Sequence, residues 1–488
     1  MRTALAAPHT AALDAARASG GNALDVALAA ATTLIVAYSH QNHLGGDLIA
    51  LVRDPDGTVH AVLSAGAAPV GVDVDAIRAA NERMPGQGPH PVTVPGIAAG
   101  WDALSKMGAT LPLSHHLHAA ATLAEEGLPV APDLARAIVN RRDAIAADPG
   151  LRSVFGTAKT GDLLRQPALA ASLRTVADDG IAAIYGGPIG ERIAAFLASL
   201  GSAMTIEDMA AHEVQITEPL VGEALGATWH VAPPPTQGIT LLSMLAGVED
   251  GRLDLHRARA ANAARDHLLG DPHGGEIDLE ALRDARAPED SGVMASPRAS
   301  GDTVAMTAVD EEGRAVTLIQ SLYAHFGSGL LEPETGIVLH NRGGGFSLEP
   351  GHPGCLAPGA RPPHTLCPSM VHAGDAVIAF GCQGGRAQPQ ILAQVAGAVA
   401  DPSSDLQAAV GRPRWIVGGA DLGYGDGETV LAEPGADAPE TEAAGAGIGF
   451  HRLDAPSGRA GHVQASRLGP DGLSAGSDPR ADGGVLIG

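Results

Sequence analysis

Cysteine is scarce in this sequence, and long hydrophobic runs are absent. The three cysteines, Cys355, Cys367 and Cys382, are an odd number confined to one half of the chain, which argues against a disulfide framework and favours a reducing compartment. The most apolar stretch, residues 27–37, contains two threonines and is shorter than the roughly 20 residues that a membrane-spanning helix needs. The N-terminal residues do not show the pattern of a signal peptide. We therefore expect a soluble, cytoplasmic protein with no membrane partner.

Basic residues are also few. The chain has 31 lysines and arginines against 55 aspartates and glutamates, so its formal net charge is -24. Such a chain repels nucleic acid and anionic membranes overall, and a small molecule is the better default ligand. Hydrophobic residues make up 45% and charged residues 18% of the 488 positions, which is the balance of a globular protein with a substantial core.

The apolar pattern divides the chain into a helix-rich part and a later sheet-rich part. Residues 11–36 are helical in pattern with a break at 19–22, where Asn22 can cap a second helix, and residues 94–264 are mainly helical. Strands are predicted at residues 48–53, 58–63, 303–310, 314–321, 336–340 and 376–381. Residues 286–302 have no apolar period and predict an exposed, mobile segment. This order fits either two domains or one layered α+β domain.

Three other patterns resemble a metal site, a nucleotide-binding loop and a catalytic cysteine, but they lack the neighbouring residues that such sites require. The histidines within residues 40–43 and 114–118 are not joined by a cysteine or carboxylate ligand pattern, so we predict no metal and no cofactor. The glycines of residues 445–449 lack the strand-turn-helix context of a nucleotide loop and predict an ordinary loop. Cys367 and Cys382 have no activated-cysteine signature, and we expect buried free thiols.

Several separated motifs are typical of one enzyme family. They are GGNALDVALAA at 21–31, HLGGD at 43–47, VPGIAAGWDAL at 94–104, PPPTQGITLLSML at 233–245, DTVAMTAVDEEGRAVTLIQS at 302–321, FGSG at 326–329, GIVLHNRGGGFS at 336–347, GHVQASRL at 461–468 and SDPRADG at 477–483. Together they resemble the gamma-glutamyltranspeptidase family of N-terminal-nucleophile hydrolases nearly from end to end. The resemblance implies an α+β fold, a four-layer αββα sandwich, made by a zymogen that cleaves itself. It implies a large subunit of residues 1–302 and a small subunit of residues 303–488, intertwined in one catalytic domain.

The resemblance assigns the nucleophile to Thr303. A threonine hydroxyl is a poor nucleophile near neutral pH and needs a base, which a free α-amino group with a pKa of about 7.7 to 8.0 supplies. Scission after Asp302 would create that amine, so maturation and activation would be one step. From pattern alone, a threonine at the start of a strand is ordinary.

The other catalytic groups follow from matching motifs. Gly384 and Gly385, after a predicted strand, correspond to the family's oxyanion hole, because adjacent glycines permit close backbone approach to a ligand. An isolated Gly-Gly is otherwise a plain turn. Thr307 and Ser321 match positions near the nucleophile, where a hydroxyl can orient the amine or the attacking oxygen; strand surface is the alternative for either.

The family's clamps for a glutamyl group are largely missing. Tyr323 replaces an asparagine, Arg342 replaces a glutamine, and Gly345 replaces the aspartate that grips the substrate's amino group. The family's paired serines fall on His364 and Thr365. The ammonium group of a glutamyl substrate therefore has no carboxylate partner at position 345.

The replacements favour a different substrate. Arg342, with His364 and Arg386 nearby in the motifs, supplies a cation suited to a carboxylate. The pattern is closer to that of the transpeptidase-like amidohydrolases and acylases, which act on oxamate or on dicarboxylic amides. A solvated loop arginine is the alternative reading of Arg342.

These observations predict an amidohydrolase that cuts a small amide with an acidic acyl group through an acyl-enzyme, with its own cleaved subunit as a partner chain. One alternative is a true gamma-glutamyltransferase or glutathione hydrolase. The other is a non-cleaving binding or scaffold protein on the same fold.

Overall fold

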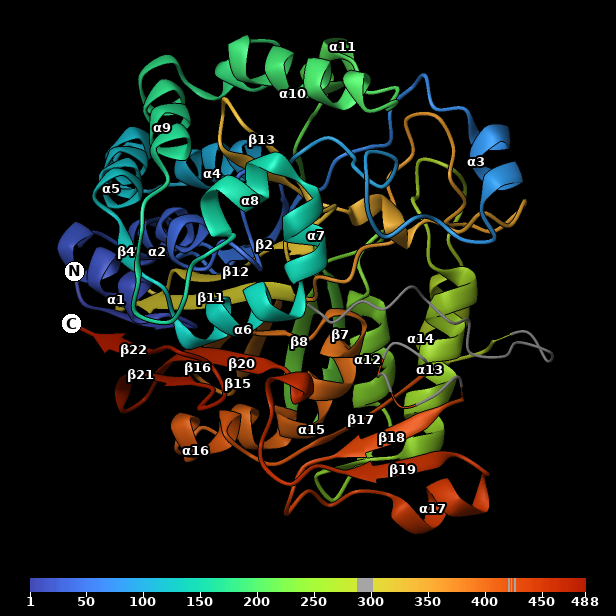
Figure 1. Cartoon of the computed structure of the whole chain (residues 1–488). Coiled ribbons are helices and arrows are strands. Elements are labelled where there is room, and N and C mark those ends of the chain that lie inside the picture. The colour runs from blue at the N-terminus through green and yellow to red at the C-terminus, as the bar shows by residue number, and fades with distance from the viewer. Residues whose placement is uncertain (288–301, 420–421, 423, 425–426) are drawn as a thin grey trace.

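A computed structural model describes residues 1–287, 302–419, 422, 424 and 427–488. Its centre is a pair of antiparallel sheets (Figure 1). The first has seven strands in the order β22-β1-β11-β12-β2-β3-β6. Its strands are β1 (Thr3–Ala7), β2 (Asp47–Arg53), β3 (Val59–Ser64), β6 (Gln215–Thr217), β11 (Asp302–Asp310), β12 (Ala315–Tyr323) and β22 (Gly484–Ile487).

The second sheet has six strands in the order β21-β20-β16-β15-β8-β7. Its strands are β7 (Leu220–Ala224), β8 (Ala227–Val231), β15 (Ser369–Ala373), β16 (Ala376–Gln383), β20 (His462–Gly469) and β21 (Gly472–Ser477). Smaller ladders are formed by β4 (Leu128–Pro129) with β5 (Leu163–Leu164), β9 (Val248–Glu249) with β10 (Arg252–Leu253), β13 (Leu330–Glu332) with β14 (Ile337–Leu339), and β17 (Trp415–Gly418), β18 (Thr429–Ala432) and β19 (Gly449–Arg452).

Helices cover the outer face of each sheet. On the side of the first sheet lie α1 (Thr10–Ser19), α2 (Ala23–Ala37), α4 (Ile97–Lys106), α5 (Leu113–Glu126), α9 (Pro167–Asp179) and α10 (Pro188–Ser199). On the side of the second lie α12 (Gly238–Leu245), α13 (Leu255–Leu268), α14 (Leu279–Asp284), α15 (Gln388–Ala400) and α16 (Leu406–Val410). Shorter helices are α3 (Val74–Ala80), α6 (Pro132–Asn140), α7 (Arg142–Ala147), α8 (Pro149–Phe155), α11 (Ile206–Ala210) and α17 (Glu440–Gly445).

Strand alternation explains the layers. On β11, Val304 and Met306 belong to the core shared with the first helical layer, whereas Ala305 and Val309 belong to the core between the sheets. Ile378 on β16 faces the second helical layer. Because each sheet buries both faces, the molecule is an α+β, four-layer αββα sandwich, as the motifs predicted.

The break after α1 is a good example of local sequence chemistry. The Asn22 side chain accepts hydrogen bonds from the backbone N–H groups of Leu24 and Asp25, and the Asp25 carboxylate accepts one from the Asn22 N–H at 2.8 Å. This capping box satisfies N–H groups that the first turn of α2 leaves without partners. The predicted cap at Asn22 is therefore confirmed.

Two predictions of local structure need correction. The helical pattern assigned to residues 94–264 was wrong for 215–231, which form β6, β7 and β8. The strand β8 pairs with β15, more than 130 residues later, so its partner is invisible to a local pattern. In the glycine-rich stretch, Gly445 ends α17 and Gly449 begins β19, which leaves only residues 446–448 as a loop. Of the predicted mobile segment 286–302, residues 288–301 lie outside the described ranges.

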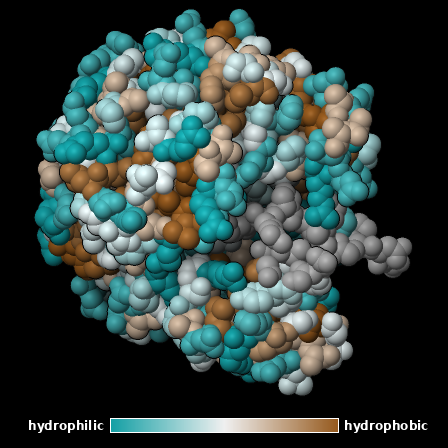
Figure 2. Space-filling view, viewed as in Figure 1, coloured by the Kyte–Doolittle hydropathy of each residue, from teal (hydrophilic) through white to brown (hydrophobic). Residues whose placement is uncertain are grey.

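The surface agrees with the composition. Hydrophilic residues cover most of the face seen in Figure 2, with apolar residues in small groups between them. None of the helices in the described ranges combines the length and apolarity needed to cross a bilayer. Cys367 and Cys382 are buried free thiols, as predicted, and burial raises the pKa of each thiol.

Candidate active site

Three polar residues lie next to each other across the first sheet. Thr303 on β11 pairs with Ser321 on β12, and Ser321 pairs with Asp47 on β2. Alternation puts Thr303 on the same face as Ala305, and Ser321 on the same face as Ile319, which is the face packed against the second sheet. All three polar residues are buried. We call Thr303, Ser321 and Asp47 the polar row.

The glycines of the HLGGD motif bring Asp47 into this row. A Cβ atom on Gly45 would lie 2.2 Å from the Val338 carbonyl oxygen, and one on Gly46 would lie 2.4 Å from the Ser321 carbonyl oxygen. Neither position has space for a side chain. The motif therefore permits the close backbone approach that starts β2 beside Ser321.

Hydrogen bonds hold the nucleophile candidate in place. The Thr303 hydroxyl donates to Ser321 Oγ at 3.1 Å, and the Tyr323 backbone N–H donates to the same oxygen at 2.8 Å. The side chain of Thr303 is stiff because threonine is branched at Cβ. Ser321 thus fixes the direction of the Thr303 hydroxyl, which is the role that the motifs suggested for a hydroxyl at that position.

Asp47 is the centre of a buried charged cluster. Its Oδ2 atom lies 3.3 Å from each of three nitrogens: Arg342 Nε, His340 Nδ1 and His364 Nε2. Burial alone would raise the pKa of Asp47, but the hydrogen bonds and charges of His340 and His364 hold it below its ordinary value. Burial, followed by the charge of Arg342, lowers the pKa of His364 to about 4. The cluster pairs the Asp47 carboxylate with the Arg342 guanidinium.

Arg342 itself is fully buried. Its Nη1 donates to Thr365 Oγ1 at 2.9 Å, and its guanidinium carbon lies 4.5 Å from the centre of the Tyr323 ring. Its Nη2 has no hydrogen-bond partner among the described residues. Burial lowers the pKa of Arg342, and the negative charge of Asp47 acts against that shift. A guanidinium nitrogen whose N–H donors are unused is a binding group for an anionic oxygen.

A cavity of about 330 Å³ adjoins this cluster. Tyr323, His364 and Thr365 line one side of it. Its further lining includes Gly345, where the motifs predicted the loss of an acidic clamp, and Arg386. Arg342 is not part of this lining but contacts two members of it, Tyr323 and Thr365. The cavity volume falls in the range of small-molecule sites.

The Gly-Gly pair lies at the end of β16, in the second sheet. Gly384 has a φ of 151°, and a Cβ there would lie 2.4 Å from Ile391 Cδ1; Gly385 has a φ of 53°. Gln237 connects this turn to the charged cluster, because its amide donates both to the Gly385 carbonyl at 2.8 Å and to the Thr365 carbonyl at 2.5 Å. The second sheet thus presents the turn beside residues that contact Arg342.

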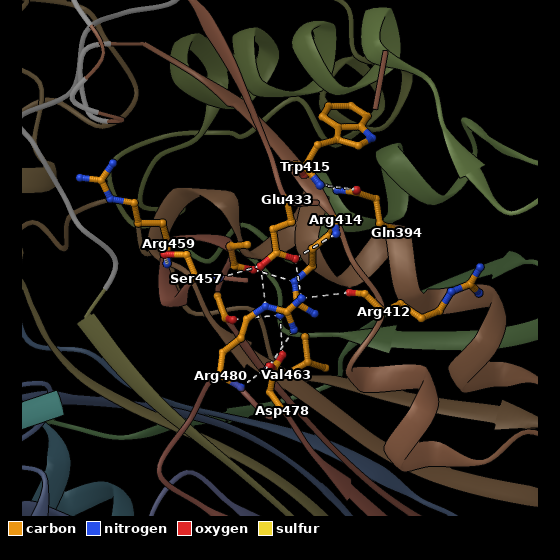
Figure 3. A network of polar contacts seen from close by, with 12 residues as sticks. Gln394, Arg412, Arg414, Trp415, Glu433, Ser457, Arg459, Val463, Asp478 and Arg480 are labelled. Carbon is orange, nitrogen blue, oxygen red and sulfur yellow. Dashed lines mark hydrogen bonds and ion pairs between the residues drawn. The ribbon is translucent and has the colours of Figure 1, made fainter. Parts of the chain in front are cut away.

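A buried ion network contains Arg414, Glu433, Asp478 and Arg480 (Figure 3). Arg414 donates to the carbonyl of Gly461 at 2.9 Å and forms an ion pair with Asp478, while Arg480 pairs with both Asp478 and Glu433. A Cβ on Gly461 would lie 2.5 Å from the carbonyl oxygen of the residue before Gly384, so the two segments touch. This gives the closing motifs GHVQASRL and SDPRADG a structural role.

Thr307 lies two positions along the same face of β11 from Ala305. Its hydroxyl and that of Ser466 on β20 are 2.9 Å apart, so it connects the two sheets. This contact is with the second sheet and not with Thr303. A direct role for Thr307 in catalysis stays a prediction.

Sequence reasoning missed three residues of the site. Asp47 and His340 stood inside quoted motifs, HLGGD and GIVLHNRGGGFS, and Gln237 stood inside PPPTQG. A buried aspartate and a histidine within such motifs were the available signal. The contact of Asp47 with Arg342 joins segments almost 300 residues apart, which no local pattern reveals.

No group of three or more histidine, cysteine or acidic side chains in the described part of the chain is arranged to hold a metal ion. Beside the Asp47 carboxylate, the Arg342 guanidinium occupies the place that a metal cation would need.

Comparison with known proteins places this geometry in context. The sequence model described as gamma-glutamyltranspeptidase matches residues 12–488. The oxamate amidohydrolase proenzyme of Klebsiella pneumoniae is 35% identical, over 98% of this chain and 97% of its own. The glutathione hydrolase proenzyme of Pseudomonas aeruginosa is 28% identical, over 96% of this chain and 91% of its own. The crystal structure of a cephalosporin acylase from Bacillus halodurans superposes with a TM-score of 0.87 at 31% identity, covering 99% of this chain and 95% of that one.

Proposed function

Because the chain belongs to the gamma-glutamyltranspeptidase family and is an enzyme of it, we propose that it is a threonine-nucleophile amidohydrolase that cleaves itself between Asp302 and Thr303. The observation that carries the proposal is the placement of Thr303. Its hydroxyl is oriented by Ser321 at the start of β11, on the face shared with Asp47. A strand that continues from the nucleophile to Asp310 would keep the hydroxyl fixed while the new terminus is freed.

Maturation adds water across the Asp302–Thr303 peptide bond. The carboxyl group stays on residue 302 and the amino group on Thr303. This α-amino group then takes the proton from Oγ as Oγ bonds to the substrate's carbonyl carbon. The backbone N–H groups at Gly384 and Gly385 stabilise the resulting oxyanion. The proton passes to the leaving amine, and water then hydrolyses the acyl-enzyme.

The sheet order supports two subunits that stay together after the cut. In the first sheet, β11 and β12 from residues 303–488 lie between β1 and β2 from residues 1–302. In the second, β15 pairs with β8 across the same division. Separating the fragments would expose both cores, so residues 1–302 and 303–488 form one intertwined catalytic domain.

We propose a small amide with an acidic acyl group as the substrate, oxamate-like or dicarboxylic. The Nη2 atom of Arg342 is a donor without a partner among the described residues, and Tyr323, His364 and Thr365 connect Arg342 to the cavity. Gly345 offers no carboxylate for a substrate ammonium group. The similarity to a protein named for oxamate supports this choice. The second candidate, gamma-glutamyl hydrolysis or transfer, is favoured by the similarity to a glutathione hydrolase.

Two experiments test the proposal. Wild-type protein should separate under denaturing conditions into copurifying fragments of about 30 and 19 kDa, from division of 49.0 kDa at Thr303. The smaller should begin Thr-Val-Ala-Met-Thr. Thr303→Ala should remain one inactive chain, and Thr303→Ser should still cleave, more slowly. An active wild-type enzyme that is one intact chain would contradict the mechanism.

The substrate class is tested with matched compounds. The wild type should hydrolyse oxamate or glutaramate faster than a gamma-glutamyl anilide. Arg342→Gln should raise KM for the acids, because it removes the cation. Efficient turnover of the gamma-glutamyl compound, with no change in acid affinity in Arg342→Gln, would favour the second candidate.

A further inference from the structure

Asp47 is the only carboxylate among the described residues that forms an ion pair with Arg342. Both side chains are fully buried. Two opposite charges enclosed together cancel most of each other's field, whereas one of them alone would dominate the pocket. Asp47 therefore offsets the field that Arg342 exerts on an arriving acid. The charged residues that line the cavity itself add to that field: Glu82, Arg83, Arg265, Asp266, Glu349 and Arg386.

We propose that Asp47 is a specificity-determining positioning residue, which holds Arg342 and offsets its charge, so that an acidic acyl group must share the guanidinium with a resident carboxylate. This inference rests on the proposed substrate class. Asp47 touches neither substrate nor reacting atoms in this scheme. It acts through Arg342 and limits how strongly the pocket prefers acids.

The neighbours of Asp47 favour this role over a purely structural one. His340 and His364 approach the same carboxylate oxygen, and the Gly66 N–H donates to the other at 3.3 Å. An asparagine at position 47 has nearly the same shape and keeps an oxygen acceptor for Arg342 Nε, at the loss of the acceptor for the long Gly66 N–H contact. Asp47→Asn therefore removes the charge while changing the packing little.

The quantity that tests the proposal is acid preference, the ratio of kcat/KM for an acid amide to that for its neutral diamide. Suitable pairs are oxamate with oxamide and glutaramate with glutaramide. Asp47→Asn should raise acid preference by about tenfold or more, mainly through a lower KM for the acid, because a like charge has been removed from an enclosed site. Asp54→Asn is the matched control. It removes a carboxylate from an ion pair with Arg314 outside the cavity, and acid preference should stay at the wild-type value.

Asp47→Asn leaves Arg342 without its counter-ion, which can impair folding. The same substitution is therefore also made in a protein that already carries Arg342→Gln. Arg342→Gln alone leaves the Asp47 charge opposing an acid, and Arg342→Gln with Asp47→Asn leaves neither charge. Acid preference should rise about tenfold from the single to the double variant. Intact mass should first establish that each variant has cleaved itself.

The outcomes separate this inference from the proposed function. If Arg342→Gln does not lower acid preference, the proposed substrate class is wrong. If Arg342→Gln lowers it but Asp47→Asn raises it in neither background, only the role of Asp47 is overturned. A change of kcat that is equal for acid and diamide would also overturn it, because a structural defect has that effect.

Discussion

The guanidinium of Arg342 lies over the ring of Tyr323, with its central carbon 4.5 Å from the ring centre. Tyr323 reaches this position with a φ of 75°, a conformation that residues other than glycine rarely adopt. Such strain is kept where the surrounding structure requires it, often at functional sites. This backbone conformation lets the Tyr323 N–H donate to Ser321 Oγ while the Tyr323 ring lies beneath Arg342.

The ring of Tyr323 is expected to contribute to acid binding through its hold on Arg342. Tyr323→Leu should raise KM for oxamate or glutaramate about threefold to tenfold, since a cation over an aromatic face is stabilised by roughly 0.5 to 2 kcal/mol. Tyr323→Phe is the control, because it keeps the ring and should leave KM within about twofold. Steady-state kinetics on the three proteins would decide, and equal effects of Leu and Phe would assign the role to the phenol hydroxyl instead.

Gly384 is expected to tolerate no side chain. Gly384→Ala should lower kcat by about 100-fold to 1,000-fold, the usual effect of losing an oxyanion donor. A Cβ there would meet Ile391 Cδ1 at 2.4 Å in a backbone conformation that favours glycine. Gly397→Ala on α15 provides the comparison, because nothing lies within 4 Å of its Cβ. If both variants keep wild-type kcat, the oxyanion hole lies elsewhere.

Buried histidines should make the protein less stable in acid. Burial lowers the pKa of His43 to about 3 and that of His364 to about 4, from 6.5. Below pH 6.5 the unfolded chain therefore binds protons that the native state does not, so the free energy of unfolding falls as pH drops from 6.5 towards 4. Above pH 6.5 this contribution is fully present. Urea unfolding across pH 7.5 to 4.5 measures the slope.

One substitution isolates the contribution of His43. The Val338 N–H donates to His43 Nδ1 at 3.1 Å, and asparagine can supply that acceptor without taking up a proton. His43→Asn should flatten the pH dependence by about one proton between pH 6 and 4.5. His118→Asn, at a half-exposed position on α5, is the comparison. An unchanged slope in His43→Asn would show that His43 is not responsible.

Metal removal should leave the activity intact. The proposed base is the α-amino group of Thr303 and the proposed oxyanion donors are backbone N–H groups, so no step needs a Lewis acid. Prolonged dialysis against a chelator, followed by assay in metal-free buffer, is the measurement. A loss that zinc alone restores would bring the histidines at 40–43 or 114–118 into the site.

The sequence predicted much of the fold and part of the site, for identifiable reasons. The strands around Thr303 and Gly384 were visible because their apolar runs are long and their turns are marked by glycine. The hairpin of β7 and β8 was missed because its strands are short and because β8 pairs with β15, far along the chain. Thr303, Ser321, Tyr323, Arg342 and Thr365 could be named individually from motifs.

What the sequence by itself determined is the set of chemical groups and the local turns that hold them: a threonine at the start of a strand, glycines where a side chain has no space, and an arginine where the family has a neutral residue. Only the tertiary structure decided the charge state of the pocket. The Asp47 carboxylate reaches Arg342 because the segment before Arg342 runs beside the glycines before Asp47: Gly45 bridges Leu339, and the His340 N–H donates to the Gly45 carbonyl at 3.0 Å. Electrostatic interaction depends on distance and burial, and neither is a property of sequence separation.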